Sequence, residues 1–209
     1  MSQQVQSEVL KVLEDRHSVK HYKAGHKLPK EDLHQLLTST SQAPSSWNLQ
    51  HWKLLVIEDQ AQKEKLLPIA YGQKQVIESS VVIAVLGDLE ANKNAELVFG
   101  PAVAGGFMPQ ELKDNLVAQI EGAYQYPQVA RDEAIRNGSL AAMQLMIAAK
   151  ALGYDTCPMG GYDAAKLVEA FNIPARYVPV MLISVGLAAT PARPSGRLSL
   201  EQITVSNTF

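Results

Sequence analysis

The sequence holds a single cysteine, Cys157, among its 209 residues. One thiol excludes an intrachain disulfide framework and a metal cage built on thiolates, and it suits a reducing compartment. No apolar run approaches the roughly 18 residues that a membrane-spanning helix needs. The first stretch, MSQQVQSEVLKVLEDR, also lacks an apolar core of the signal-peptide type. We therefore expect a soluble, cytoplasmic protein with no membrane partner.

The sequence also lacks an excess of either charge, because the net charge is -2 and the pI is about 6.2. This balance predicts no nucleic-acid partner. The motifs GxxxxGKS or GxxxxGKT, GxGxxG and HExxH are missing, which argues against a P-loop enzyme, a Rossmann site and a zinc protease. His17, His21 and His26 cluster in a predicted loop, where such spacing is more typical of solvated side chains than of metal ligands. We therefore predict no metal.

The apolar pattern predicts a mixture of helices and strands. Helical spacing covers residues 5–15, and Pro29 suits the first turn of a second helix. The strongest helix runs from Arg131 to Leu152; it is apolar nearly all round after Ser139 and is expected to be the central buried helix. In contrast, residues 96–109 hold three glycines and two prolines, which predicts that no helix forms there.

Three apolar stretches read as strands: HWKLLVIE, VVIAVLG and VPVMLISVGLA. The continuous run in VVIAVLG is typical of a strand that is buried on both faces. Because two helices precede the first strand, a simple doubly wound sheet fits poorly, and we predict an α+β fold. With 46% apolar residues, one domain over 1–209 can bury a sizeable core.

Two polar stretches are candidates for a binding site. In RHSVK, at 16–20, an extended chain would point Arg16, Ser18 and Lys20 the same way, and these side chains suit a phosphate. The alternative is a basic surface turn. In PSSWNLQ, at 44–50, hydroxyl and carboxamide groups suit the polar edge of a flat heterocycle. The alternative there is the end of a helix before a strand, with Trp47 anchored in the core.

Five blocks taken together resemble the FMN-dependent nitroreductase family, in particular its short bacterial NAD(P)H-dependent members. In chain order they are RHSVKHY, APSSWNLQHW, GQKQV, CPMGGYD and SGRLSLEQI, and they span essentially the whole sequence. The resemblance implies an α/β sandwich with a central antiparallel-type mixed sheet flanked by helices. It also implies an intertwined homodimer that holds one FMN in each of two interface sites.

The resemblance assigns FMN-binding residues to both subunits. From one subunit these are Arg16, His17, Ser18 and Lys20; from the other they are Pro44, Ser45, Ser46 and Asn48. Further positions that match the family are Gln73, Gln75, Gly160, Gly161 and Arg197, the last as a phosphate ligand. Lys20 and Gly161 would tune the flavin. The chain departs from the pattern at Ser195, where related sequences often carry a basic residue, and Arg193 is the candidate substitute.

The activity implied by the resemblance is hydride transfer from NAD(P)H, through flavin N5, to nitroaromatic or quinone-type acceptors by a ping-pong mechanism. No catalytic side chain is required, because the cofactor carries the chemistry. An FMN store or sensor without a reductase role would share the same contacts and stays as the alternative. The segment 96–127 either caps the pocket and selects the acceptor or packs in an interface.

Overall fold

The computed structural model describes residues 7–209. Its first half contains α1 (Glu8–Asp15), α2 (Lys30–Ser41), η1 (Ser46–Asn48), β1 (Trp52–Ile57), α3 (Gln60–Ile69), α4 (Gln75–Glu78), β2 (Val81–Asp88) and η2 (Ala91–Asn94). Its second half contains α5 (Ala95–Ala104), α6 (Gln110–Tyr124), α7 (Pro127–Ala151), β3 (Asp155–Met159), α8 (Ala164–Ala170), β4 (Tyr177–Gly186) and α9 (Leu200–Ile203). Residues 5 and 6 of the expected first helix lie outside the described residues.

The four strands form one sheet in the order β1-β2-β4-β3, and each neighbouring pair is antiparallel. A parallel bridge between Ser18 and Thr156 adds the N-terminal segment beside β3. The inner strand β2 is buried along its whole length, as its continuous apolar run predicts. The sheet is therefore the centre of the molecule.

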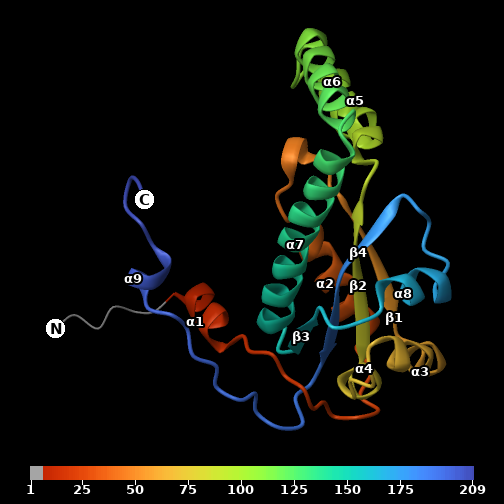
Figure 1. The fold of residues 1–209 in the computed structure, drawn as a ribbon, viewed down its shortest axis with the longest axis vertical. Helices are drawn as coiled ribbons and strands as arrows, with labels where there is room; N and C mark the ends of the chain where they lie inside the picture. Colours follow the sequence, from red (N-terminus) through yellow and green to blue (C-terminus); the bar gives the residue numbers. More distant parts are fainter. Residues whose placement is uncertain (1–6) are drawn as a thin grey trace.

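Side chains of β2 alternate between two cores because successive residues of a strand point to opposite faces. Val82 and Ala84 pack with α3 and α8, whereas Ile83 and Val85 pack with α2 and α7. Figure 1 shows α2 and α7 on one side of the sheet and α3 and α8 on the other. This helix–sheet–helix layering confirms the α+β prediction.

The long helix α7 differs from its prediction in two ways. It begins at Pro127, four residues before the expected Arg131, because proline suits the first turn of a helix. The expectation of a central buried helix holds for one face only, since Leu140 is 42% exposed and Met143 is 39% exposed. One face of α7 packs on the sheet, and within this chain its other face stays open.

The prediction that residues 96–109 exclude a helix is wrong. Helix α5 passes through Gly100 and Pro101 and ends at Ala104, two residues before Gly106, which adopts a φ of +74°. Burial of Phe99 against α6 supplies packing that local composition does not reveal. The two helices form an arm, defined here as residues 91–126, which projects beyond one end of the sheet (Figure 1).

Strand β3 and helix α9 were not foreseen from the sequence. Strand β3 contains Pro158, and a proline is tolerated there because β3 is the last strand of the sheet, paired with β4 on one side and bridged at Thr156 by the N-terminal segment on the other. Helix α9 has only four residues and is closed by a capping box between Ser199 and Gln202. Within residues 7–209, no helix is long and apolar enough to cross a membrane.

Candidate functional site

The N-terminal segment runs extended beside β3. The Val19 amide donates a hydrogen bond to the Thr156 carbonyl at 3.0 Å, and the Val19 side chain is 2% exposed. Alternation along the extended chain therefore points Ser18 and Lys20 outward, as the sequence predicts. Arg16 is half-buried and forms the C-cap of α1.

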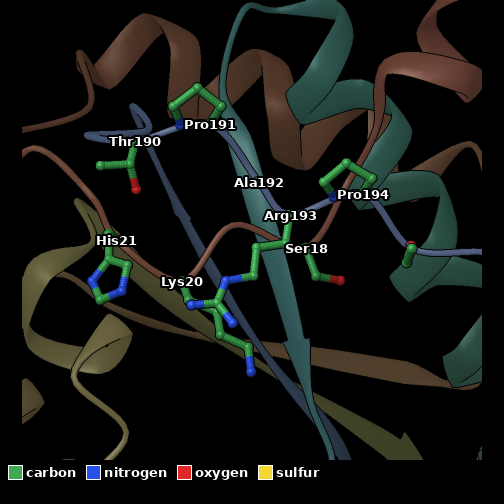
Figure 2. A pocket seen from close by; sticks show the side chains of 9 residues that line it. Ser18, Lys20, His21, Thr190, Pro191, Ala192, Arg193 and Pro194 are labelled. Carbon is green, nitrogen blue, oxygen red and sulfur yellow. The ribbon is translucent and has the colours of Figure 1, made fainter.

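The C-terminal tail crosses this segment and encloses a cavity with it. An antiparallel bridge joins Tyr22 to Ala188, and the Ala189 amide donates to the His21 carbonyl at 2.9 Å. The cavity has a volume of about 550 Å³ and is lined by Ser18, Lys20, His21, Thr190, Pro191, Ala192, Arg193, Pro194 and Ser195. Figure 2 shows the side chains of Lys20 and Arg193 extending in the same direction. An ammonium, a guanidinium and hydroxyl groups suit an anion such as phosphate.

Two further predicted ligands, Arg197 and His17, do not line this cavity. The Nη1 of Arg197 donates to the Ser195 carbonyl at 3.1 Å and to the Ser195 Oγ at 2.9 Å, so Arg197 folds onto its own loop. His17 lines a neighbouring cavity of about 300 Å³, which shares Pro191 and Ala192 with the first. Of the two arginines of the tail, Arg193 lines the cavity and Arg197 does not, and the role of Arg193 as a phosphate ligand stays a prediction.

Four more predicted residues lie together at the end of β3. The Nε2 of Gln73 donates to the Gly161 carbonyl at 2.8 Å, and the Nε2 of Gln75 donates to the Gln73 Oε1 at 3.1 Å. A Cβ added at Gly160 would meet nothing within 4 Å, and one added at Gly161 would meet only the Gln73 Nε2, at 3.9 Å. The chain's own packing does not require glycine at either position, so the open surface suits close approach of a flat ring.

The turn at residues 44–50 has an unusual backbone. Trp47, Asn48 and Gln50 adopt φ values of 52°, 55° and 51°, in the left-handed region. That conformation costs a non-glycine residue roughly 1–2 kcal/mol, although asparagine tolerates it better. The Trp47 ring packs against the apolar cluster of the arm, as the core-anchor alternative predicts. The turn therefore needs compensating contacts to persist.

Two polar residues of α7 supply such contacts. The Ser46 amide donates to the Asn137 Oδ1 at 2.9 Å, and the Ser46 Oγ donates to the Glu133 Oε2 at 2.5 Å. Burial alone would raise the pKa of Glu133, but hydrogen bonds from Ser46 and Asn137 and the charge of Arg136 hold that pKa below its usual value. Sequence reasoning missed Glu133 and Asn137; their spacing of four residues on an otherwise small-residue face was the available signal.

The two halves of the predicted site lie at opposite ends of the sheet. Ser18 bridges Thr156, which pairs with Val185 and through it with Val81, the first residue of β2. The turn at 44–50 leads into Trp52, which pairs with Gly87 near the last residue of β2. Within one chain, the structure thus brings Ser18 and Lys20 together with Arg193, but not with Ser45, Ser46 or Asn48.

Within residues 7–209, no group of three or more His, Cys, Asp or Glu side chains is placed to hold a metal ion. Cys157 is 4% exposed and belongs to the core beneath the N-terminal segment. Burial raises the pKa of its thiol, while the charges of Lys20 and Arg16 oppose that effect. Cys157 is therefore a protonated core residue at neutral pH.

The geometry defines a class of protein. It is a layered α+β fold in which the N-terminal segment and the C-terminal tail enclose a cavity lined by cationic side chains. The model of the nitroreductase family matches residues 13–187. The chain is 52% identical over 194 residues to "Putative NAD(P)H nitroreductase YodC" of Bacillus subtilis (strain 168), covering 93% of this chain and 96% of that protein. The chain therefore belongs to the nitroreductase family.

Solved structures agree with this assignment. A structure described as "putative nitroreductase ydfN", from Bacillus subtilis, superposes with a TM-score of 0.90 at 37% identity, covering 95% of this chain and 98% of that chain. A structure described as a "putative nitroreductase in complex with FMN", from Exiguobacterium sibiricum 255-15, superposes with a TM-score of 0.88 at 39% identity. That comparison covers 98% of this chain and 99% of the other.

Proposed function

We propose that this protein is an FMN-dependent oxidoreductase that takes reducing equivalents from NAD(P)H and delivers them to nitroaromatic or quinone-type acceptors by a ping-pong mechanism. The observation that carries the proposal is the cavity that unites Ser18, Lys20 and Arg193. The FMN complex of a relative of 39% identity supports the choice of cofactor. The name of the relative with 52% identity supports NAD(P)H as the electron donor.

The residues present fit FMN. Arg193 and the Ser18 hydroxyl offer donors to a phosphate from the cavity wall, and the Lys20 ammonium adds a positive charge beside them. Arg16 and His17 are proposed to lie next to this cavity, whereas Arg197, which folds onto its own loop, should contribute little. The backbone of Gly160 and Gly161 leaves room for the ring, and Gln73 and Gln75 offer carboxamides beside it. Strand β3 links these two regions. Ser18 bridges Thr156 in that strand, and Gly160 follows Met159, the last residue of the strand.

The separation of the two halves supports a homodimer. Pro44, Ser45, Ser46 and Asn48 lie at the far end of the sheet from Lys20, so we propose that they reach the cofactor held by a partner subunit. Several apolar side chains that a partner could cover are exposed in the single chain: Val9, Leu10, Leu13, Leu140, Met143, Leu200 and Ile203.

Bound FMN would supply the hydride-accepting and electron-donating chemistry, and the chain supplies binding and orientation. The ammonium of Lys20, which is exposed in the cavity wall, would stabilise negative charge on the reduced cofactor. The glycine pair leaves the approach to the ring free of side chains. Under this proposal no side-chain acid or base is needed.

The test is a visible absorption spectrum of the purified, dialysed protein, recorded before and after anaerobic NADPH and, separately, NADH. We expect a flavin band that at least one nucleotide bleaches and that a nitroaromatic or a quinone then restores. A band that neither nucleotide bleaches would favour an FMN store or sensor. Absence of a band even after added FMN would overturn the proposal.

A further inference from the structure

The turn at residues 44–50 is fixed at both of its ends to other elements of the fold. At its start, Ser46 contacts Asn137 and Glu133 of α7 through its amide and its hydroxyl. At its end, the Nδ2 of Asn94 donates to the Leu49 carbonyl at 2.9 Å. Trp47 and Asn48, the left-handed residues between these points, are therefore held in part by contacts outside the turn.

The contact with Glu133 gives the two neighbouring serines different roles. The Ser46 hydroxyl donates its proton to the Glu133 carboxylate and keeps only acceptor capacity. The Ser45 Oγ accepts from the Gln50 amide at 2.9 Å, so its proton is free for another acceptor. The Asn137 Nδ2 also donates to the Glu133 Oε2, at 2.8 Å, which fixes the carboxylate in place. Glu133 is 9% exposed, so water competes weakly for these bonds.

We infer that Glu133 is a positioning residue that, through Ser46, holds the turn at 44–50 in its cofactor-binding conformation. The inference rests on the proposed function, in which Ser45, Ser46 and Asn48 contact FMN. Glu133 itself need not touch the cofactor. Its effect arises because a ligand that binds one conformation loses apparent affinity in proportion to the fraction of molecules that leave that conformation.

The variant Glu133→Ala removes both acceptor oxygens, and Glu133→Gln keeps one acceptor at the same length. The matched control is Asp132→Ala, which removes a carboxylate from the next residue of α7, on an exposed site that contacts Gln128. Should Glu133→Ala fail to fold, Glu133→Asp takes its place, because it keeps the charge but withdraws the carboxylate from Ser46.

The first readout is amide hydrogen exchange of the protein without cofactor. The amides of Asn48, Leu49 and Gln50 donate within the turn, to the Ser45 carbonyl, the Ser46 carbonyl and the Ser45 hydroxyl. We expect Glu133→Ala to accelerate their exchange at least about tenfold, because the turn opens locally without global unfolding. Glu133→Gln should stay near the wild type, and Asp132→Ala should not change these amides.

The second readout is FMN affinity, measured well below the unfolding temperature of each variant. If the held turn falls to roughly a tenth of the molecules, Glu133→Ala should bind FMN about tenfold more weakly. In a Ser46→Ala background, Glu133→Ala should cause a smaller loss than in the wild type, because the hydroxyl contact is already gone and only the route through Asn137 and the residue 46 amide is left. A general loss of stability would not depend on Ser46 in this way.

The two readouts separate the possible failures. Unchanged exchange in Glu133→Ala would overturn the inference whether or not FMN binds. Faster exchange with unchanged FMN affinity would also overturn it, because the turn would then not limit binding. If the wild type bound no FMN, the proposed function would fail and the link to the cofactor with it, while exchange would still decide whether Glu133 holds the turn.

Discussion

Ser195 occupies a position where the family resemblance leads one to expect a basic residue, and the structure places Arg193 in the cavity instead. Replacing Arg193 with alanine should weaken FMN binding about tenfold. A hydrogen bond between charged groups contributes about 1.5–3 kcal/mol of binding free energy, and an exposed one contributes about 1.5 kcal/mol. The measurement is quenching of FMN fluorescence during titration with dialysed protein.

The matched control at this scale is Arg197→Ala. The Arg197 Nη1 already donates to the Ser195 and Gly196 carbonyls, so its loss should change FMN affinity less than about threefold. The reverse ranking, with Arg197 dominant, would show that the tail rearranges when the cofactor or a partner subunit binds. Because both variants remove one arginine from the same tail, the comparison cancels the change in net charge.

Sequence reasoning succeeded for side chains whose direction follows from local geometry. Alternation along an extended segment predicts that Ser18 and Lys20 point the same way, and both line the cavity, whereas Arg16, which was expected to point with them, is the half-buried C-cap of α1. The method could not find Glu133, because its partner Ser46 is 87 residues away along the chain. Nor could it rank Arg193 above Arg197, since their difference depends on how the tail crosses the N-terminal segment.

At the scale of elements, contacts between residues far apart in the sequence also explain why helix α5 of the arm was not predicted. Gly100 and Pro101 argue against a helix locally, yet α5 forms because Ala95 and Phe99 are buried in a cluster with Leu49 and Ile120. Packing between distant segments overrides local propensity. The strands β1, β2 and β4 were predictable because each has a short apolar run of its own, and in β2 that run is buried along its whole length.

The base of the arm is joined to the sheet by a bidentate ion pair. Arg176 donates to Asp88 through Nε at 2.7 Å and through Nη2 at 2.6 Å, and its Nη2 also donates to the Asn94 Oδ1 at 3.1 Å. The Asp88 side chain is only 4% exposed. Replacing Arg176 with alanine should therefore cost about 3 kcal/mol of unfolding free energy, because a buried carboxylate loses its partner.

Urea unfolding followed by circular dichroism measures this cost, and Lys93→Ala is the control. Lys93 pairs with Glu90 at 2.6 Å in the same part of the arm, but their side chains are 59% and 44% exposed. An exposed pair of this kind contributes less than about 1 kcal/mol. Equal losses in the two variants would contradict the claim that the ion pair of Asp88 is what fixes the arm.

At the scale of the whole molecule, the two halves of the proposed site lie too far apart within one chain to contact the same cofactor. They are separated by the length of β2, and no motion of a side chain can join them. The C-terminal tail and α9 extend away from the sheet, together with α1 (Figure 1). A second copy that pairs with this surface would bring the turn at 44–50 of one subunit to the cofactor held by the other. The single domain over 1–209 and the homodimer both remain predictions.

The exposed face of α7 offers the sharpest test of the homodimer. A double substitution, Leu140→Glu with Met143→Glu, places two charges on that face, where the native side chains are 42% and 39% exposed. If a partner covers this face, buried unpaired charge should prevent assembly. The wild type should then sediment as a dimer at micromolar concentration, and the variant as a monomer with FMN affinity reduced more than about tenfold.

Lys166→Glu is the matched control, because it makes the same change in net charge on α8, across the sheet from α7. It should leave the protein dimeric and able to bind FMN, since α8 packs on the opposite face of the sheet. Sedimentation of the wild type as a monomer with FMN bound tightly would contradict the homodimer. The serines and asparagine of the turn at 44–50 would then need another role, because within one chain they lie at the end of β2 opposite to Lys20.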